Sequence, residues 1–468
     1  MAPTTHKTIK LNQCRISPTG DDDLTEKSLP LTLFDVQWLN FHPLHRVLFY
    51  EYPCSTTHFA NTIVPNLKKS LSLTLNHYFP LAGNLLYPLN SGTPVLRYRA
   101  GDSVRLTIAE CNRVSDFYNL SGHQTREADE FYNYVPQLPD SIIESGWEII
   151  PVLAIQVTLF PECGICIGIT SDHVVGDASS IADFINAWGS INKFGGDEQF
   201  LDGKCKPFYD RSVVKDLSGL AIKRWNHVRM RKNIDLSPVS GFSIPTNRVR
   251  ATHVLTRDDI AKLKVFLFTK FTLMRPNLVH LSSFTIASSL AWTCLVKSES
   301  ACREKIDDDE PEYFAFLADA RSRSNPPLPP TYFGNCLASG FIVESTHGRL
   351  KGNEGFLIAA ELIGELIRKK ANDKNEIFKG AEDWMSNYEA LSGKRVFGVA
   401  ESTKIDIYDA DYGWGRPKKF ESVFIDRDRY SMSLIKSRDF EGGLEIGLSL
   451  PMILMDAFAG FFADGLKK

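Results

Sequence analysis

The stretch Ile165-Cys-Ile-Gly-Ile-Thr170, followed by Ser-Asp-His173-Val-Val-Gly-Asp177 and a run to Ile191, decides the fold class of this chain. Its first six residues are mostly apolar and β-branched, which is typical of a buried β-strand. Apolar residues then recur at helical spacing, at Ile181, Phe184, Ile185, Trp188 and Ile191. The stretch therefore predicts a strand, a short loop that carries His173, and a helix, which together indicate the α/β class.

The same alternation of strand and helix patterns continues on both sides. A strand is predicted over residues 152–160, joined to the one at Ile165 by a hairpin turn at Pro161-Glu-Cys-Gly164. Further strands are predicted over residues 251–255, 431–435 and 444–450, and helices over 59–78, 257–268, 281–296 and 456–466. The chain is thus expected to form two mixed α/β halves of similar size.

Between the halves the pattern weakens, and Pro207, Pro238 and Pro245 interrupt it. A long connection of this kind within 468 residues is typical of a linker between domains. We therefore predict an N-terminal domain over residues 1–194, a crossover linker over 195–246 and a C-terminal domain over 247–468.

Composition argues against several kinds of partner. The net charge of −3 provides no electrostatic basis for binding a nucleic acid. No apolar run has the length of a signal peptide or of a membrane span. The nine cysteines are odd in number and scattered, which suits reduced thiols. We expect a cytoplasmic monomer with no nucleic-acid or membrane partner.

Several catalytic motifs are missing from the sequence. It has no Gly-x-x-x-x-Gly-Lys phosphate loop, no Gly-x-Gly-x-x-Gly after a strand, no His-Glu-x-x-His helix and no Gly-x-Ser-x-Gly elbow. Together these absences argue against nucleotide hydrolysis, dinucleotide redox chemistry, zinc proteolysis and serine-hydrolase chemistry.

His173 remains as a candidate general base, because an imidazole suits proton removal from a hydroxyl near neutral pH. Gly176 is expected to let the loop turn tightly, and Asp177 to cap the next helix or to hold a nearby cation. Because His-x-x-x-Asp is a loose pattern, the spacing alone favours the simpler interpretation of a surface histidine followed by a capping aspartate.

Companion motifs favour the catalytic interpretation. The segment from His173 to Ala178 matches a His-x-x-x-Asp-Gly element, with alanine in the last place and Asp172 where a second histidine is common. An Asp-Phe-Gly-Trp-Gly element appears as Asp411-Tyr-Gly413-Trp414-Gly415. Pro80-Leu-Ala-Gly83, Asn325-Pro-Pro-Leu-Pro329 and Tyr332-Phe-Gly-Asn-Cys336 accompany them. With these motifs the chain resembles the plant BAHD acyltransferases from end to end, in particular the branch that acylates anthocyanins and other phenolic glycosides.

This resemblance implies two chloramphenicol-acetyltransferase-like domains of mixed sheet and helices, joined by a long crossover loop, with a channel at their interface. His173 would act there as the general base, with acyl-CoA as a co-substrate and neither a metal nor a covalent intermediate. Asp177 would support the His173 loop, and Arg321 is its expected partner. The turn at Asp411, Gly413, Trp414 and Gly415 would shape the CoA side.

Further residues are candidates for a role in the site, but each also has a simpler structural explanation. Ser402 and Thr403 are candidates to stabilise the oxyanion, or are exposed strand hydroxyls. Ser282, Ser283 and Lys264 are candidates for binding CoA, or are a helix cap and a solvated lysine. Asp35 and Trp38 are expected to line the acceptor pocket, although Trp38 equally suits a place in the core.

We therefore expect a malonyl or hydroxycinnamoyl group to pass from CoA to a sugar hydroxyl of an anthocyanin, flavonoid or other phenolic glycoside, with malonyl slightly favoured. A cation would be needed for the malonyl carboxylate, and a flat apolar slot for hydroxycinnamoyl. The alternatives are an alkaloid alcohol or amine as the acceptor, and a catalytically silent ligand-binding relative. A condensation-type domain fed by a carrier protein would need a longer, modular chain.

Overall fold

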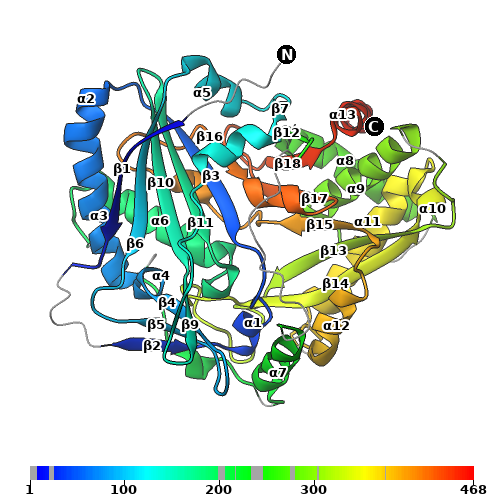
Figure 1. The fold of residues 1–468 in the computed structure, drawn as a ribbon. Helices are drawn as coiled ribbons and strands as arrows, with labels where there is room; N and C mark the ends of the chain where they lie inside the picture. Colours follow the sequence, from blue (N-terminus) through cyan, green and yellow to red (C-terminus); the bar gives the residue numbers. More distant parts are fainter. Residues whose placement is uncertain are drawn as a thin grey trace.

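The computed structural model describes residues 8–19, 26–198, 206–216, 218–232, 246–274, 280–302, 305–374 and 376–467, and Figure 1 shows their arrangement. Residues 199–205, 217 and 233–245 of the predicted linker, which include Pro238 and Pro245, lie outside these residues, as does the N-terminal acidic run at residues 21–23. Within the described residues, no helix is both long and apolar enough to cross a membrane.

The first large sheet holds the strand that leads to His173. Its six strands are, in spatial order, β1 (Thr8–Ile16), β6 (Val104–Cys111), β10 (Leu153–Phe160), β11 (Gly164–Ser171), β3 (Leu44–Glu51) and β16 (Lys419–Ser422). Strands β10 and β11 pair as the predicted antiparallel hairpin, and every residue of both is buried. They are mostly apolar because both faces of this part of the sheet are covered.

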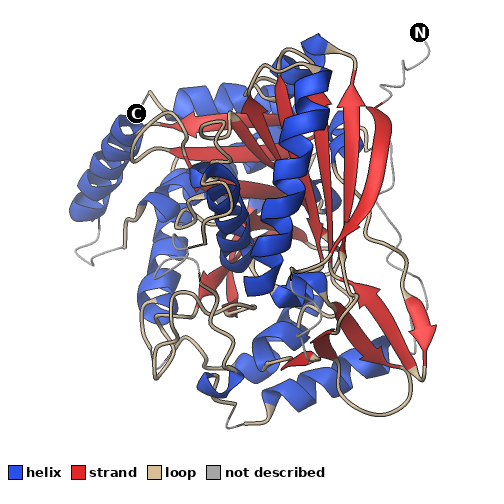
Figure 2. Cartoon of the chain, turned by 90° about the vertical axis from the view of Figure 1, so that its left-hand side faces the viewer, coloured by secondary structure: helices blue, strands red, loops and turns tan. Residues whose placement is uncertain are grey.

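Two long helices cover one face of the first sheet. They are α3 (Val64–His77), which follows α2 (Thr56–His58) and the π-helical turn η2 (Phe59–Ile63), and α6 (Ala178–Lys193). Leu67 and Leu71 of α3 share one core with Ile181 and Ile185 of α6. The run from α2 through α3 stands in front of the strands in Figure 2. The buried stripe predicted after Asp177 therefore faces the sheet and α3.

The second large sheet belongs mainly to the C-terminal half. Its seven strands are β14 (Leu337–Thr346), β13 (Pro311–Asp319), β15 (Arg395–Ala400), β17 (Ser431–Lys436), β18 (Leu444–Leu450), β12 (Val249–Leu255) and β7 (Arg126–Glu127). The helices on this side are α8 (Arg257–Met274), α9 (Ser283–Cys302), α11 (Gly355–Leu366) and α13 (Met452–Gly465). Helix α9 packs against α8, α11 and α13, which explains why it is apolar on nearly every side.

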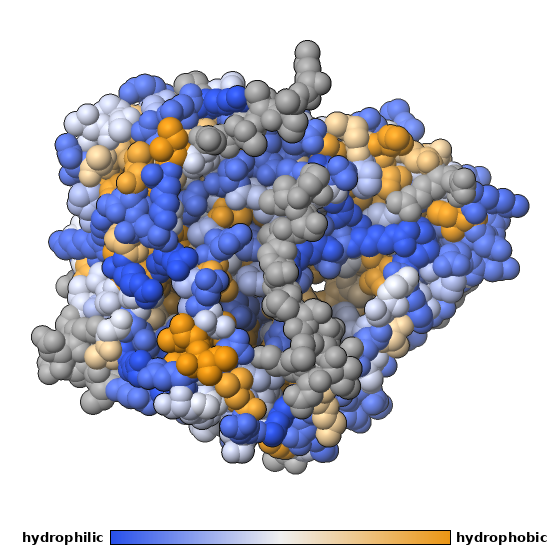
Figure 3. Space-filling model, viewed as in Figure 1, coloured by the Kyte–Doolittle hydropathy of each residue, from blue (hydrophilic) through white to orange (hydrophobic). Residues whose placement is uncertain are grey.

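A smaller sheet and several short helices complete the described chain. The sheet runs β2 (Lys27–Pro30), β5 (Val95–Tyr98), β4 (Asn84–Pro88), β9 (Trp147–Pro151) and β8 (Ile142–Glu144). The helices are α1 (Leu33–Val36), α4 (Phe79–Ala82), α5 (Val114–Leu120), α7 (Leu220–Lys232), α10 (His347–Lys351) and α12 (Trp384–Glu389). Figure 3 shows a mostly hydrophilic face that is hollowed near its middle, between the two halves.

The two halves exchange strands. Strand β16, late in the chain, pairs with β3 of the first sheet, and β7, early in the chain, pairs with β12 of the second. Buried ion pairs cross the same junction, where Arg250 of β12 lies 3.2 Å from Glu421 of β16. The predicted domain boundaries at residues 194 and 247 remain a proposal, because each large sheet includes one strand from the other half of the chain.

Candidate active site

His173 lies in a single turn of 3-10 helix, His173–Val175, directly after β11. The Asp172 carboxylate caps this turn by accepting a hydrogen bond from the Val174 N–H over 2.9 Å. Gly176 then continues in extended backbone, with φ 170°, and not in the tight turn expected from the sequence. Close packing requires a glycine at position 176, since a Cβ there would lie 2.9 Å from Cβ of Ser180.

The imidazole of His173 is buried, with 8% of the residue exposed. The Trp38 ring stacks on it in parallel, with 3.8 Å between ring centroids. Burial, reinforced by the positive charge of Arg46 and opposed by the charge of Asp177, lowers the pKa of His173 to about 4. The ring is therefore neutral near pH 7 and able to accept a proton.

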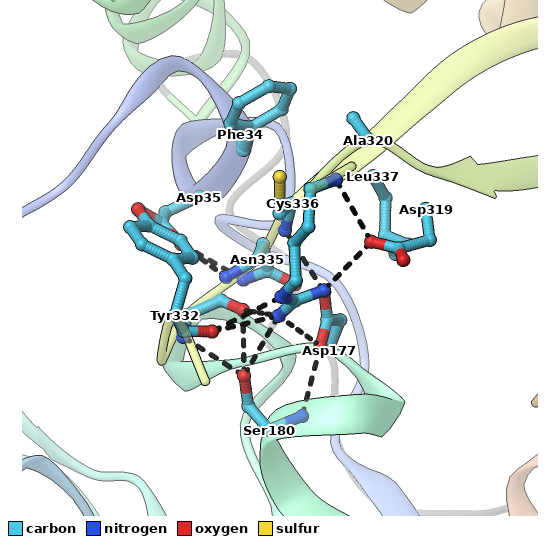
Figure 4. Close-up of polar contacts among 12 residues, drawn as sticks. Phe34, Asp35, Asp177, Ser180, Asp319, Ala320, Tyr332, Asn335, Cys336 and Leu337 are labelled. Atoms are coloured by element: carbon cyan, nitrogen blue, oxygen red, sulfur yellow. Dashed lines mark hydrogen bonds and ion pairs between the residues drawn. The ribbon is translucent and has the colours of Figure 1, made fainter. Parts of the chain in front are cut away.

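The Asp177 carboxylate faces the C-terminal half. Arg321 donates to its two oxygens over 2.8 and 3.0 Å, and the Cys336 N–H donates over 3.0 Å. Asp177 also caps α6 through the Ser180 N–H, as Figure 4 shows. Although burial opposes it, the Arg321 guanidinium holds the pKa of Asp177 below its usual range. Asp177 is thus an ionised anchor for the loop.

Arg321 joins α6 to the segment from Tyr332 to Cys336. Its guanidinium donates to the carbonyls of Tyr332 and Gly334, each over 3.1 Å, as well as to Asp177. Ser180 completes the junction, since its hydroxyl donates to the Gly334 carbonyl and accepts from the Gly334 N–H. Residues far apart in sequence therefore fix the backbone around His173 from both halves.

Asn335 is a site residue to which the sequence assigned no role. It is fully buried, and its Nδ2 donates to the carbonyls of His173 over 2.9 Å and of Val174 over 3.2 Å. The same nitrogen and the Asn335 N–H both donate to Oδ1 of Asp35. The signal available in the sequence was its place in the motif from Tyr332 to Cys336.

Asp35 and Trp38, expected in the acceptor pocket, differ in environment. Asp35 is fully buried and completes a capping box with Thr32, whose N–H and hydroxyl both donate to Oδ2. Its carboxylate is thus committed to Thr32 and Asn335, as Figure 4 illustrates for Asn335. Trp38 lies just beyond α1 and is the residue of this pair that contacts His173.

The turn from Asp411 to Gly415 is closed by one carboxylate. Asp411 Oδ1 accepts the N–H groups of Gly413 over 2.8 Å and of Gly415 over 2.9 Å. Gly413 and Gly415 have φ values of 92° and 86°, which side chains other than glycine rarely adopt. Asp411 Oδ2 accepts from Lys193 over 2.8 Å, so the turn is attached to the last residue of α6.

The aromatic residues of this turn pack on the first sheet. Trp414 stacks on Tyr412 and Tyr52, with centroids 5.3 and 5.8 Å apart. Helix α6 separates the turn from Asp177 by its whole length, about 24 Å for 16 residues. The structure therefore does not bring Asp411, Gly413, Trp414 or Gly415 to His173, but places them at the far end of the helix that Asp177 begins.

Ser402 and Thr403 lie in the loop after β15 and not within a strand. The strand ends at Ala400, and Glu401 adopts a φ of 63°. Ser402 Oγ accepts the Lys404 N–H over 3.2 Å, which leaves the hydroxyl free to donate elsewhere. Glu401 Oε1 accepts from Arg46 Nε over 2.9 Å, so the loop is fastened to a residue whose charge acts on His173.

The three residues expected to bind CoA lie on two helices that contact each other, α8 and α9. Ser282 caps α9 by accepting the Thr285 N–H over 3.1 Å. Ser283 is exposed at the start of α9, and Lys264 is exposed on the neighbouring α8. A helix N-terminus suits a phosphate, while Ser282 also serves as an ordinary cap, so the binding of CoA by these residues remains a prediction.

Known proteins resemble this chain over its whole length. Residues 10–463 match the Transferase family. The chain is 47% identical over 465 residues to a malonyl-coenzyme:anthocyanin 5-O-glucoside-6'''-O-malonyltransferase of Salvia splendens, covering 98% of this chain and 95% of that protein. It is 48% identical over 459 residues to phenolic glucoside malonyltransferase 1 of Nicotiana tabacum, covering 98% and 99%. The crystal structure of vinorine synthase superposes with a TM-score of 0.69 at 20% identity, covering 96% of both chains, which confirms the predicted two-domain α/β fold.

Proposed function

The chain belongs to the Transferase family of BAHD acyl-CoA-dependent acyltransferases, and we propose that it moves a malonyl group from malonyl-CoA to a sugar hydroxyl of an anthocyanin or another phenolic glucoside. Identity of 47–48% with two malonyltransferases that act on such glucosides carries the choice of substrates. The buried, neutral imidazole of His173 supports the chemistry.

In the proposed reaction His173 removes the proton of the sugar hydroxyl. The sugar oxygen attacks the thioester carbonyl, and the bond from that carbon to sulfur breaks as the tetrahedral intermediate collapses. His173 then returns its proton to the departing thiolate of CoA. Because a thioester is already activated, no covalent acyl-enzyme is needed.

The oxyanion of the intermediate requires hydrogen-bond donors. The hydroxyls of Ser402 and Thr403 are our candidates, because their loop is tied through Glu401 to Arg46, whose positive charge acts on His173. Replacement of one such donor is expected to lower kcat about 100-fold or more.

Arg46 favours malonyl as the donor group. The residue is 3% exposed, its Nε is paired with Glu401, and its guanidinium lies over the Phe424 ring. Its Nη1 is buried, and no described residue accepts a hydrogen bond from it. A buried guanidinium nitrogen lacking an acceptor is unfavourable, and a carboxylate is the group that best satisfies it. The distal carboxylate of malonyl-CoA supplies such a group, whereas an acetyl or coumaroyl group does not.

A panel of acyl donors tests this proposal. Malonyl-, acetyl- and coumaroyl-CoA are each offered with an anthocyanin glucoside and with a simple phenolic glucoside, and the products are identified by mass. We expect a malonylated glucoside from malonyl-CoA and slower transfer from the other donors. Preference for coumaroyl-CoA overturns the choice of donor, and transfer only to alcohols or amines that carry no sugar overturns the acceptor.

The variant Arg46→Gln tests the carboxylate partner separately. We expect kcat/KM for malonyl-CoA to fall about 10- to 100-fold, with little change for acetyl-CoA, since one charge-assisted interaction is lost. Arg416→Gln is the matched control, because that guanidinium is exposed and pairs with Asp409 on the surface. An equal loss with both donors contradicts the role of Arg46.

A further inference from the structure

No described carboxylate is hydrogen-bonded to the ring of His173, although such a group often orients a catalytic histidine. Its Nδ1 is buried, and no described residue forms a hydrogen bond with it. Asp177, the carboxylate closest in sequence after the turn, is engaged by Arg321. Asn335 donates to the backbone carbonyl of His173, and its side chain also interacts with the ring in the sense that raises the His173 pKa. Hydrogen bonds therefore fix the backbone of His173, while the orientation of its ring depends on the Asn335 side chain and on contacts with neighbouring rings.

Two aromatic rings supply those contacts. Trp38 lies parallel to the imidazole, with an interplanar angle of 1° and 3.8 Å between centroids. Phe41 meets the imidazole at 87° with 5.3 Å between centroids, and meets Trp38 at 87° with 5.2 Å. One ring covers the face of the imidazole while the other stands perpendicular to it, so rotation about either side-chain torsion of His173 meets an obstacle.

We propose that Trp38 and Phe41 form an aromatic clamp that orients His173 for proton transfer, in place of an orienting carboxylate. The proposal rests on the proposed function, since it assumes that His173 is the base. Both are positioning residues that act through the imidazole.

The clamp and the histidine are aligned by a shared partner. Asn335 Nδ2 donates to the carbonyl of His173 on one side and to Asp35, in α1, on the other. Helix α1 leads directly into the turn that carries Trp38. Both sides of the stack are thus positioned by one amide, whose bond to Asp35 appears in Figure 4.

The local backbone brings the two aromatic rings to one side. Asn40, between Trp38 and Phe41, adopts a φ of 67°, a left-handed conformation that asparagine tolerates better than most residues. This reversal lets the rings of Trp38 and Phe41 meet edge to face while both contact His173.

The stack has a chemical consequence beyond orientation. During the reaction the imidazole accepts a proton and becomes a cation. The face of an indole attracts a cation, so the contact with Trp38 is stronger in the transition state than in the resting enzyme. Loss of the clamp is therefore expected to act on kcat and to leave the binding of CoA unchanged.

The test compares Trp38→Leu, Trp38→Phe and Phe41→Leu with Trp147→Leu, a control on β9 in the small sheet. We expect Trp38→Leu to lower kcat about 10- to 100-fold, because a misplaced base loses its geometry, with KM for malonyl-CoA within about twofold. Trp38→Phe keeps a stacking ring and is expected to recover most of kcat. Phe41→Leu is expected to give a smaller loss, and Trp147→Leu none.

A second readout does not depend on turnover. The His173 ring is titrated by NMR with isotope-labelled histidine, and the signal is assigned with His173→Ala. In Trp38→Leu we expect the His173 pKa to rise from about 4 toward the ordinary 6.5, because burial is the largest cause of the lowered value and access of water outweighs the lost attraction of the indole face. Unchanged kcat and an unchanged titration in Trp38→Leu overturn the clamp, as does a loss confined to KM for the glucoside.

The two proposals fail in different ways. If His173→Ala retains full transfer activity, the assignment of the base is wrong. If His173→Ala is inactive while Trp38→Leu and Phe41→Leu are both fully active, only the clamp is wrong.

Discussion

Asp177 and Arg321 form a buried ion pair across the two halves of the chain, with Nη1 of Arg321 2.8 Å from Oδ2 of Asp177. Asp177 begins α6 in the N-terminal half, and Arg321 follows β13 in the C-terminal half. The carboxylate is thus directed to the interface, and we propose that it acts by holding the loop that runs from His173 to Asp177.

Asp177→Asn is expected to destabilise the protein by about 3–5 kcal/mol, because it leaves the Arg321 guanidinium buried with less compensation. Turnover by the folded fraction is expected to fall as the His173 loop loosens. Urea unfolding and kcat measured on the same preparation check both effects. Asp319→Asn is the matched control, since Asp319 lies 3.1 Å from the same guanidinium but is partly exposed. Unchanged stability with lost activity indicates a direct chemical role instead.

The same ion pair predicts how stability depends on pH. The pKa of Asp177 is lower in the folded protein than the usual 3.8, so the pair stabilises the fold above about pH 4. This contribution is expected to disappear as the pH falls through the lowered folded value. Thermal melting between pH 6 and 3 tests the prediction, since the wild type should lose stability faster than Asp177→Asn below about pH 4.

The pH profile of activity reports on His173. Burial lowers its pKa to about 4, so the base stays neutral through the range in which an ordinary histidine becomes protonated near 6.5. We expect kcat/KM for the glucoside to fall only at a pH well below 6.5. An acidic limb centred at pH 7 or above contradicts the buried state of the base.

The local elements around His173 follow directly from the sequence. The hairpin of β10 and β11, the helix α6 and the cap at Asp177 all depend on residues within a few positions of one another. The apolar positions that recur in the sequence are the positions that are buried in the structure, so the pattern predicts the elements. The expected pair of Asp177 with Arg321 came from family resemblance, since nothing in the local sequence specifies a partner 144 positions away.

Long-range features escaped prediction for physical reasons. Strands β16 and β7 span four and two residues, too few for any alternation to appear, yet they join the two halves. Asn335 looks like an ordinary loop residue in the sequence. Its importance becomes visible only in the structure, because its three acceptors belong to other segments of the chain. The extended backbone at Gly176 was mistaken for a tight turn, since a glycine required by close packing looks the same in sequence as one required by backbone conformation.

Asn335→Ala is expected to lower kcat and to destabilise the fold by about 1–3 kcal/mol, because two carbonyls and the Asp35 carboxylate lose a buried donor. Asn335→Asp is expected to be worse, since it places a carboxylate against Asp35. Asn186→Ala on α6 is the control, because its amide meets a carbonyl near the surface. Wild-type kinetics in Asn335→Ala would show that His173 needs no support from this amide.

At Gly415 the effect of backbone strain on stability can be measured without a contribution from side-chain packing. Gly415 has a φ of 86°, and a Cβ added there meets no atom within 4 Å. Gly415→Ala is therefore expected to cost about 1–2 kcal/mol from backbone conformation alone. Gly460, in α13, has equally open surroundings but helical backbone, so Gly460→Ala is expected to stabilise by about 0.5–1 kcal/mol.

Because the turn lies at the far end of α6 from His173, kcat per folded molecule of Gly415→Ala should match the wild type, while its unfolding midpoint falls. A fall in kcat with unchanged stability would instead place this turn in contact with CoA.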